Sequence, residues 1–400
     1  MASPEAASQA QSSQEVLRVL KQATYFVIFA VPNPSSLSVG RPLLPFIPQL
    51  IYGIDVTEVP HRFSSSALPP TAEKGFRVHK TIGTKQIAKQ QFKLLLMPNN
   101  FEAGPGRTPP PTVLLPFLVQ RFWMHDGHFD FLDDQDAGLR LVAAGRFFPA
   151  PSGLGVYAGA VAEVIEGLGQ LQGLRGNVVI NGITTPPDQF ANLFTFRVVD
   201  PEGKLQGTPL PPVEAEEPDP DYTYSSVLNL MAEVHPDDPI VVEPLPNSSE
   251  QQVHLLERLR LVNTNLDVGP GYLKADNVES EVVGERRTTF VFNPNDSLDT
   301  IPLYSTNSEF TFFTGSRQPI GTLQVDLCEG RAFRTSSPDL SHPYFRIAGY
   351  GFYGKGTGQF KDIEGMLTMN GALSLTPGVT SSMYTLRILD PHGHFRALWS

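Results

Sequence analysis

GLGQLQGLRGNVVING at residues 167–182 is repeated as GTGQFKDIEGMLTMNG at residues 356–371. The stretch TFRVVDPEG at residues 195–203 then returns as TLRILDPHG at residues 385–393. Most of the identical positions are Gly, Asn, Asp or Pro, residue types that shape the backbone at turns. A repeat of this length predicts two copies of one folding unit, so it decides the architecture before any other feature of the chain.

Apolar and polar residues alternate within both copies. Val178 and Ile180 show this alternation in the first copy, and a period of two is typical of half-buried antiparallel strands. Asn181-Gly182 and Asn370-Gly371 predict hairpin turns, because both residue types tolerate positive φ. The 37 prolines are spread along the 400 residues and leave little room for long helices. We therefore predict an all-β protein whose strands form closed barrels or a sandwich.

Two further blocks extend the repeat upstream. Residues 127–133 resemble residues 321–327, and residues 96–100 resemble residues 292–296, in the same order in both copies. The motif SSQE at residues 12–15 also has a similar counterpart, SSEQ, near the middle of the chain. This last pair leaves open that each unit begins further back.

The repeat divides the chain into four parts. We predict a first β-barrel over residues 76–207 and a second over residues 276–400. Residues 1–75 are then an N-terminal extension, expected to be partly disordered at its small, polar start. Residues 208–275 form an acidic, Pro-rich linker. SSEQ at residues 248–251 has the spacing of a capping box, so the linker is predicted to contain a short helix.

Charge and cysteine content restrict the possible partners and location. Thirty Lys and Arg against 41 Asp and Glu give a net charge of −11, which disfavours nucleic acid and anionic membranes as partners. The apolar stretch 23–31 is too short to span a bilayer, and the N-terminus lacks the basic region of a secretory signal. The single cysteine, Cys328, excludes an internal disulfide and fits a reducing compartment. We therefore expect a cytoplasmic protein.

The glycine-rich segment resembles a hairpin of the allene oxide cyclase and dirigent barrel superfamily. The residues that carry the resemblance in the second copy are Gly356, Gly358, Phe360 and Gly365. The corresponding residues of the first copy are Gly167, Gly169, Gly176 and, in place of the aromatic residue, Leu171. The resemblance implies two tandem antiparallel β-barrels with apolar interiors and few short helices. It also implies a cyclase or isomerase of secondary metabolism.

The second copy is richer in aromatic residues near its glycine hairpin, so we expect a site there. A tyrosine has an apolar body and a hydroxyl tip, which suits orientation of a small ligand in an apolar barrel. The candidate catalytic residues are Tyr353, Tyr350 and Glu163, the last as a buried general base of the first copy. The candidate ligand-binding residues are Phe352, Phe360, Phe345 and Tyr157. Core packing of the tyrosines and exposure of Glu163 are the alternatives.

Other motifs have simpler structural explanations. Gly349–Gly354 fits the pattern G-x-G-x-x-G, but a strand follows it where a dinucleotide site needs a helix. His125 and His128 lie near aspartates, yet the segment has the pattern of a polar hairpin end. Arg197 and Arg387 recur on the polar strand face, where cross-strand ion pairs would account for them. We expect neither a metal nor a cofactor.

Two functions are compatible with this sequence. The first is a cyclase or isomerase that acts on a reactive, largely apolar small molecule by confining it in a barrel pocket. The second is a non-catalytic small-ligand-binding or scaffold protein, with its barrels packed solid. A pocket with convergent polar groups favours the first, and an interior filled by aromatic rings favours the second. A homo-oligomer is compatible with both. Chemistry should lie where the copies differ, at Leu171 and Phe360, Gly173 and Asp362, Arg175 and Glu364.

Overall fold

The computed structural model consists of β-strands and their connections, which confirms the all-β prediction. Its described part contains no α-helix, and its helical elements are two 3-10 turns, η1 (Gly169–Leu171) and η3 (Gly358–Phe360). The described residues are 24–31, 34–44, 47–58, 86–97, 121–131, 137–149, 156–185, 189–199, 225–234, 238, 240–262, 272–273, 278–296, 300–313, 316–335, 344–374 and 380–389.

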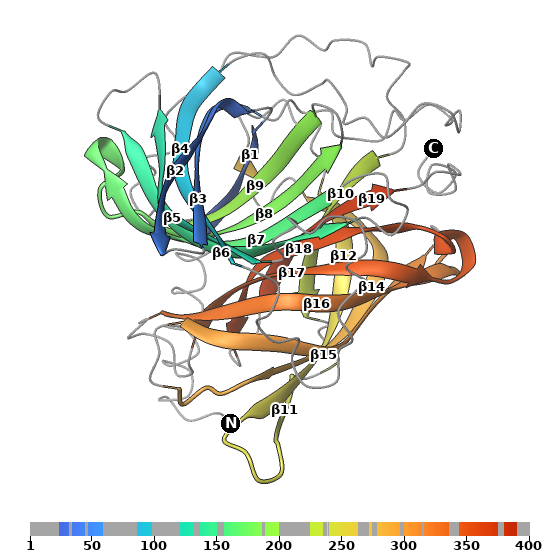
Figure 1. The fold of residues 1–400 in the computed structure, drawn as a ribbon. Helices are drawn as coiled ribbons and strands as arrows, with labels where there is room; N and C mark the ends of the chain where they lie inside the picture. Colours follow the sequence, from blue (N-terminus) through green and yellow to red (C-terminus); the bar gives the residue numbers. More distant parts are fainter. Residues whose placement is uncertain are drawn as a thin grey trace.

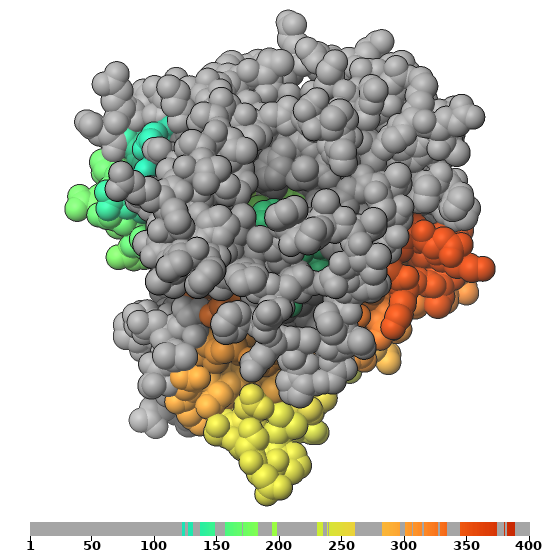
Figure 2. Space-filling model, in the orientation of Figure 1, coloured from blue at the N-terminus to red at the C-terminus, as the bar shows by residue number. Residues whose placement is uncertain are grey.

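The C-terminal sheet closes into a barrel. Its strands are β10 (Ser225–Val234), β11 (Val241–Pro244), β12 (Gln251–Val262), β14 (Val278–Phe292), β15 (Thr300–Phe313), β16 (Pro319–Thr335), β17 (Tyr344–Gly356), β18 (Glu364–Ser374) and β19 (Ser381–Leu389). Strand β10 pairs with β19 on one side and β12 on the other, so an antiparallel ring of eight strands is complete. Strand β11 lies outside this ring, and Figure 2 shows its hairpin with β12, in yellow, projecting from the lower edge of the molecule.

The N-terminal sheet has the same strand order. Its strands are β1 (Thr24–Val31), β2 (Pro34–Leu44), β3 (Ile47–Glu58), β4 (Gln86–Met97), β5 (Arg121–Phe131), β6 (Gly138–Pro149), β7 (Val156–Leu168), β8 (Arg175–Thr185), β9 (Gln189–Val199) and the short β13 (Tyr272–Leu273). Strand β1 pairs with β9 and also with β3, as β10 pairs with β19 and β12. Each strand from β1 to β9 therefore has a counterpart in the C-terminal sheet.

Both sheets include strands that precede the predicted units in the chain. Strands β1 to β3 lie within the predicted extension 1–75, and β10 to β12 lie within the predicted linker 208–275. The helix predicted after Ser248 is wrong, since this segment is strand β12. The Ser248 hydroxyl accepts a hydrogen bond from the Glu250 N–H at 3.0 Å, but in a turn before a strand. Pairing with β10, β11 and β14 satisfies the β12 backbone and overrides the local capping signal.

Strand order also corrects one of the sequence blocks. The described residues of the first block, 127–131, lie on β5, whereas residues 321–327 lie on β16, whose counterpart is β6. That match was therefore one strand out of step. The match of residues 96–100 to residues 292–296 aligns the end of β4 with the end of β14, and these two strands are counterparts in the strand order. Residues 12–15 lie outside the described residues.

The glycine-rich segments make tight turns that close against one end of each sheet. A Cβ on Gly356 would lie 2.0 Å from the Phe360 carbonyl oxygen, and one on Gly167 would lie 1.9 Å from that of Leu171. Only glycine permits this approach, so the matched glycines have a steric cause. The turn buries Phe360, whose ring stacks on Phe312 with centroids 4.8 Å apart.

The difference between Gly173 and Asp362 also belongs to this turn. Gly173 has φ of 90° and Asp362 has φ of 67°, so both adopt a left-handed backbone. Aspartate tolerates this conformation better than most residues, because its short polar side chain can hydrogen-bond locally. The two copies therefore use different residues for the same turn.

The two sheets lie side by side, with β7 and β8 next to β16, β17 and β18 (Figure 1). Val161 and Val179 of the first sheet pack in one buried cluster with Ala348, Tyr350 and Phe333 of the second. The polar faces predicted to be half exposed are therefore partly covered by the other sheet. This burial decides the roles of several residues that the sequence assigned differently.

Asn181 and Asn370 show the consequence. They lie inside β8 and β18, so the predicted hairpin turns at these positions are wrong. The Asn181 amide donates to backbone carbonyls of β18 and β19 at 3.4 and 3.1 Å, and the Asn370 amide donates to carbonyls of β8 and β9 at 3.0 and 2.9 Å. Arg387 Nε and Nη2 donate to the side-chain and backbone oxygens of Asn181, each at 3.0 Å. Arg387, for which the sequence predicted cross-strand ion pairs, thus forms hydrogen bonds across the contact between the two sheets.

Candidate functional site

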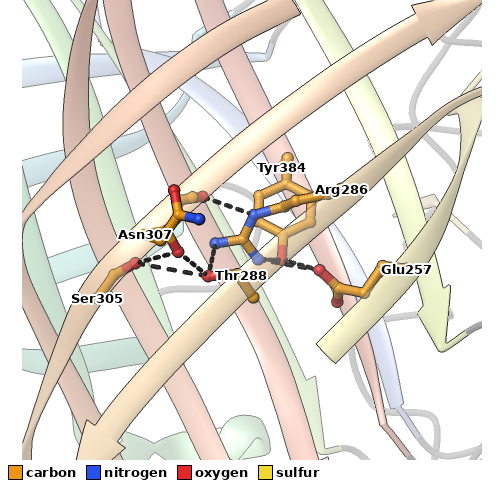
Figure 3. A network of polar contacts seen from close by, with 7 residues as sticks. Glu257, Arg286, Thr288, Ser305, Asn307 and Tyr384 are labelled. Carbon is orange, nitrogen blue, oxygen red and sulfur yellow. Dashed lines mark hydrogen bonds and ion pairs between the residues drawn. The ribbon is translucent and has the colours of Figure 1, made fainter. Parts of the chain in front are cut away.

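A polar network lies inside the C-terminal barrel (Figure 3). Its charged members are Glu257 on β12 and Arg286 on β14, and Tyr384 on β19 lies beside them. All three side chains are at most 1% exposed. They come from strands that are distant in sequence, and closure of the ring brings β12 and β19 to either side of β10. The fold therefore builds this cluster from three separate parts of the chain.

Arg286 is the centre of the network. Its Nη1 donates to Glu257 Oε2 at 2.9 Å and also to the Tyr384 hydroxyl. Its Nε donates to Ser308 Oγ at 2.9 Å, and its Nη2 donates to Thr288 Oγ1 at 3.1 Å. Every nitrogen of the guanidinium is thus engaged, which meets the requirement that a buried charge be paired and hydrogen-bonded.

Aromatic rings enclose the same guanidinium. Its central carbon lies 5.2 Å from the Phe290 ring centroid, 5.3 Å from that of Phe310 and 4.6 Å from that of Tyr384. Cations within about 6 Å of a ring face are attracted by its quadrupole. The rings therefore contribute to stabilising Arg286 and also form an apolar wall around the network.

A bulge in the β14–β15 pairing supplies the hydroxyl groups. The register shifts between Thr289 and Phe290, so Ser305 and Ser308 can both be buried although their positions differ in parity. The Ser305 hydroxyl donates to the Asn307 carbonyl at 3.1 Å, and the Thr288 hydroxyl donates to the same oxygen at 3.0 Å. These two hydroxyl groups are thereby fixed by the backbone.

Glu257 is satisfied on one oxygen only. Its Oε2 accepts two hydrogen bonds, one from Arg286 Nη1 and one from the Tyr384 hydroxyl, each with a donor–acceptor distance of 2.9 Å. Its Oε1 is buried and has no hydrogen-bond partner in the structure. A buried polar atom left without a partner costs about 1–3 kcal/mol, and more when it belongs to a charged group. This oxygen is therefore the part of the network able to take a donor from a bound molecule.

The Tyr384 hydroxyl remains protonated well beyond neutral pH. Burial is the largest cause that raises its pKa well above 10, and the nearby Glu257 carboxylate raises the pKa further, while Arg286 opposes both. The tyrosine therefore acts as a hydrogen-bond donor to Glu257. The network can hold a carboxylate in one orientation beside apolar walls, which suits proton transfer to and from a small molecule.

Three of the residues predicted from sequence lie in the interior of the C-terminal barrel. Tyr353, Phe360 and Phe345 belong to its buried core. The Tyr353 hydroxyl donates to the Arg387 carbonyl at 2.6 Å, so it is engaged with the backbone of β19. Phe345 packs edge-on against Phe292, with centroids 5.4 Å apart. These contacts give the three residues packing roles, and their predicted functional roles stay predictions.

The other four predicted residues lie between the two sheets, so their expected place inside a barrel was wrong. The Tyr350 hydroxyl donates to Glu329 at 3.0 Å. Glu163 forms an ion pair with Arg346 of the other sheet at 3.1 Å. The two remaining residues, Phe352 and Tyr157, pack against each other with centroids 5.9 Å apart. The cause is the period of two, because strand residues of one parity face the core and those of the other parity face the neighbouring sheet.

The sequence contained a signal for Glu257 that the helix prediction concealed. Val253, Leu255 and Leu259 are buried on β12, and Glu257 occupies the inward position between them. In a strand with a period of two, a charged residue at an apolar position indicates a buried polar site. Arg286 gives the same signal on β14, where Phe290 shares its inward parity.

Comparison of the chain with protein-family models and with curated proteins finds no match. In the described part of the chain, no helix has the length and apolar character needed to cross a membrane. The same residues include no group of three or more His, Cys, Asp or Glu side chains placed to hold a metal ion. The candidate site is therefore defined by its own geometry.

Proposed function

We propose that the C-terminal barrel confines a largely apolar small molecule and catalyses its cyclisation or isomerisation, with Glu257 as the proton-transfer group. The observation that supports this most is the buried Oε1 of Glu257, which has no partner while Oε2 has two. A buried polar atom without a partner calls for a specific explanation, and a catalytic role is one of the recognised ones. A bound substrate would supply the missing contact.

The proposed reaction needs only this chain and its substrate. Glu257 Oε1 accepts a proton from one atom of the bound molecule and returns it to another atom of the same molecule, so product and substrate are isomers. Arg286 and Tyr384 hold Oε2 and fix the direction of the carboxylate. The aromatic walls exclude water and hold the substrate in a compact, reactive shape.

A filled interior favours the alternative, a non-catalytic small-ligand-binding or scaffold barrel. Aromatic rings occupy much of the described core, for example Phe310 edge-on to Tyr384 at 5.4 Å and Phe312 stacked on Phe360 at 4.8 Å. In that case the pair of Glu257 and Arg286 would serve to specify how the strands align, a role attested for some buried ionic groups.

We also propose that the N-terminal sheet is a second barrel derived from the same ancestral unit. The repeated sequence, the shared strand order and the pairing of β1 with β3 support this. The resemblance to allene oxide cyclase and dirigent barrels remains part of the proposal, as do the cytoplasmic location and self-association.

The direct test is native mass spectrometry of the protein purified from its own host. We expect the wild-type chain to retain an apolar small molecule. We expect Glu257→Gln to lose this molecule or to show a changed ratio of ligand-bound to free protein. Comparison of Tyr384→Phe with Tyr353→Phe separates the two candidate sites, because both remove one buried hydroxyl from the same barrel. The larger effect is expected for Tyr384→Phe. A wild-type protein that retains no small molecule and binds none on incubation with apolar metabolite extracts supports the scaffold alternative.

A further inference from the structure

We infer that the ligand of the C-terminal barrel is an uncharged molecule with a hydroxyl group on an apolar body, an alcohol rather than a carboxylate lipid. The inference rests on the proposed function and names its substrate class. It follows from the hydrogen bond between Arg286 and Glu257 Oε2 and from the absence of a hydrogen-bond partner at Glu257 Oε1.

The unpartnered atom is an acceptor. Glu257 Oε1 is buried, and Oε2 of the same carboxylate already has two donors. A ligand that satisfies Oε1 must bring a hydrogen-bond donor to it. A hydroxyl group does so without a charge of its own, and its proton is one that a carboxylate can accept during a reaction.

The cation of the network already uses four of its five N–H groups within the barrel. Nε, Nη1 and Nη2 of Arg286 donate to Ser308, to Glu257 and Tyr384, and to Thr288. A ligand carboxylate at this position would meet the negative charge of Glu257 without a free guanidinium edge to bind it. Burial makes such repulsion stronger than it would be in water.

A cationic ligand is disfavoured by the opposite contact. An ammonium group at Glu257 would share the carboxylate with Arg286 Nη1, which lies 2.9 Å from Oε2. The charges of Glu257 and Arg286 already balance, so any charged ligand leaves one charge in excess inside the barrel. A neutral donor preserves the balance.

The surroundings of the network fit an apolar body. Phe290 and Phe310 lie against the guanidinium, and Leu255 and Leu259 flank Glu257 on β12. The hydroxyls of Thr288 and Ser305 are fixed on the Asn307 carbonyl. This part of the barrel therefore offers a ligand the Glu257 Oε1 acceptor beside apolar side chains.

The test compares three probes with one carbon skeleton, decan-1-ol, decanoate and decane, with the full-length protein near neutral pH. Binding is measured by native mass spectrometry and, where it is detected, by isothermal titration calorimetry. We expect decan-1-ol to bind at least about tenfold more tightly than decane, because a hydrogen bond to a charged acceptor contributes that much. We expect decanoate to bind more weakly than decan-1-ol by a similar factor.

Glu257→Gln is the discriminating variant, and Glu166→Gln, an exposed carboxylate on β7, is its matched control. In Glu257→Gln the preference for decan-1-ol over decanoate should fall to within about threefold, because the repelling charge is gone. In Glu166→Gln the preference should stay at the wild-type value. Circular dichroism and the unfolding midpoint show whether each variant is folded.

Each outcome decides a different question. Binding of none of the three probes to the wild-type chain overturns the proposed function itself. Binding of decanoate at least as tightly as decan-1-ol overturns the substrate class and leaves a ligand-binding barrel. Equal affinity for decan-1-ol and decane shows that Oε1 makes no contact with the hydroxyl and also overturns the class. If a folded Glu257→Gln protein keeps the wild-type preference for decan-1-ol over decanoate, the ligand hydroxyl contacts a residue other than Glu257, and the inference is overturned.

Discussion

Removal of the Arg286 guanidinium should be among the most damaging single changes to the C-terminal barrel. Arg286→Met leaves Glu257 as a buried charge with only the Tyr384 hydroxyl beside it. Removal of one partner of a buried ion pair costs about 3–5 kcal/mol. Glu257→Leu should cost a similar amount for the opposite reason. The double variant should be far more stable than the sum of the two losses predicts, because an apolar pair of similar volume replaces a charge pair at little net cost.

The assay is urea unfolding of the four proteins in a double-mutant cycle, with intrinsic fluorescence as the probe. A coupling energy of about 2–3 kcal/mol or more is expected, within the range measured for groups in one buried network. Arg140 and Glu166 provide the control cycle, since they form an ion pair of 3.2 Å but are 52% and 50% exposed. Their coupling should be below about 1 kcal/mol. Additive losses at Glu257 and Arg286 would refute the claim that the two charges depend on each other.

Three further predictions concern backbone, pH and the contact between the sheets. Gly356→Ala should lower the free energy of unfolding by about 1–3 kcal/mol in denaturant titrations, because its Cβ would lie 2.0 Å from a carbonyl oxygen. A Cβ at Gly354 would have no atom within 4 Å, so Gly354→Ala should change the free energy of unfolding by less than about 0.5 kcal/mol. Stability should fall as pH rises above 10: burial raises the folded-state pKa of Tyr384 well above 10, so the unfolded chain loses this proton first and gains up to about 1.4 kcal/mol per pH unit. Burial lowers the pKa of Arg387 to about 10, so this residue acts in the opposite direction above that pH. Because Tyr384→Phe removes the titrating hydroxyl, it should reduce the loss of stability at alkaline pH, measured as a pH series of urea midpoints. Asn370→Ala should cost about 1–3 kcal/mol, because two carbonyls of the first sheet lose their donor, and an unchanged midpoint would show that water replaces the amide.

The candidate site shows which part of it local sequence could not reveal. Glu257 and Arg286 each occupy an inward position on a strand, and each could be flagged from the period of two once the strands were assigned. Their meeting depends on the pairing of β12 with β14, and the approach of Tyr384 depends on closure of the barrel through β10. Local spacing carries no information about closure, since the partners are far apart in the chain.

The roles of Tyr350, Glu163 and Asn181 were missed for a related reason. Alternation correctly separates the two faces of β7, β8 and β17, but it does not say which face meets water. A second sheet covers the face that sequence reasoning took to be exposed, or placed inside a barrel. Burial between two sheets gives a polar residue partners that no local motif encodes.

Strand content and the tight glycine turns were determined by the sequence itself, because alternation, positive φ and steric contact are local properties of the backbone. Gly356 and Gly167 could be recognised from their spacing alone, and the structure supplies the steric reason. The location of a buried carboxylate, its partners and the surface shared by the two sheets were decided only by tertiary structure. Those features depend on which distant strands pair and on which faces lose contact with water, and both are set by the packing of the whole chain.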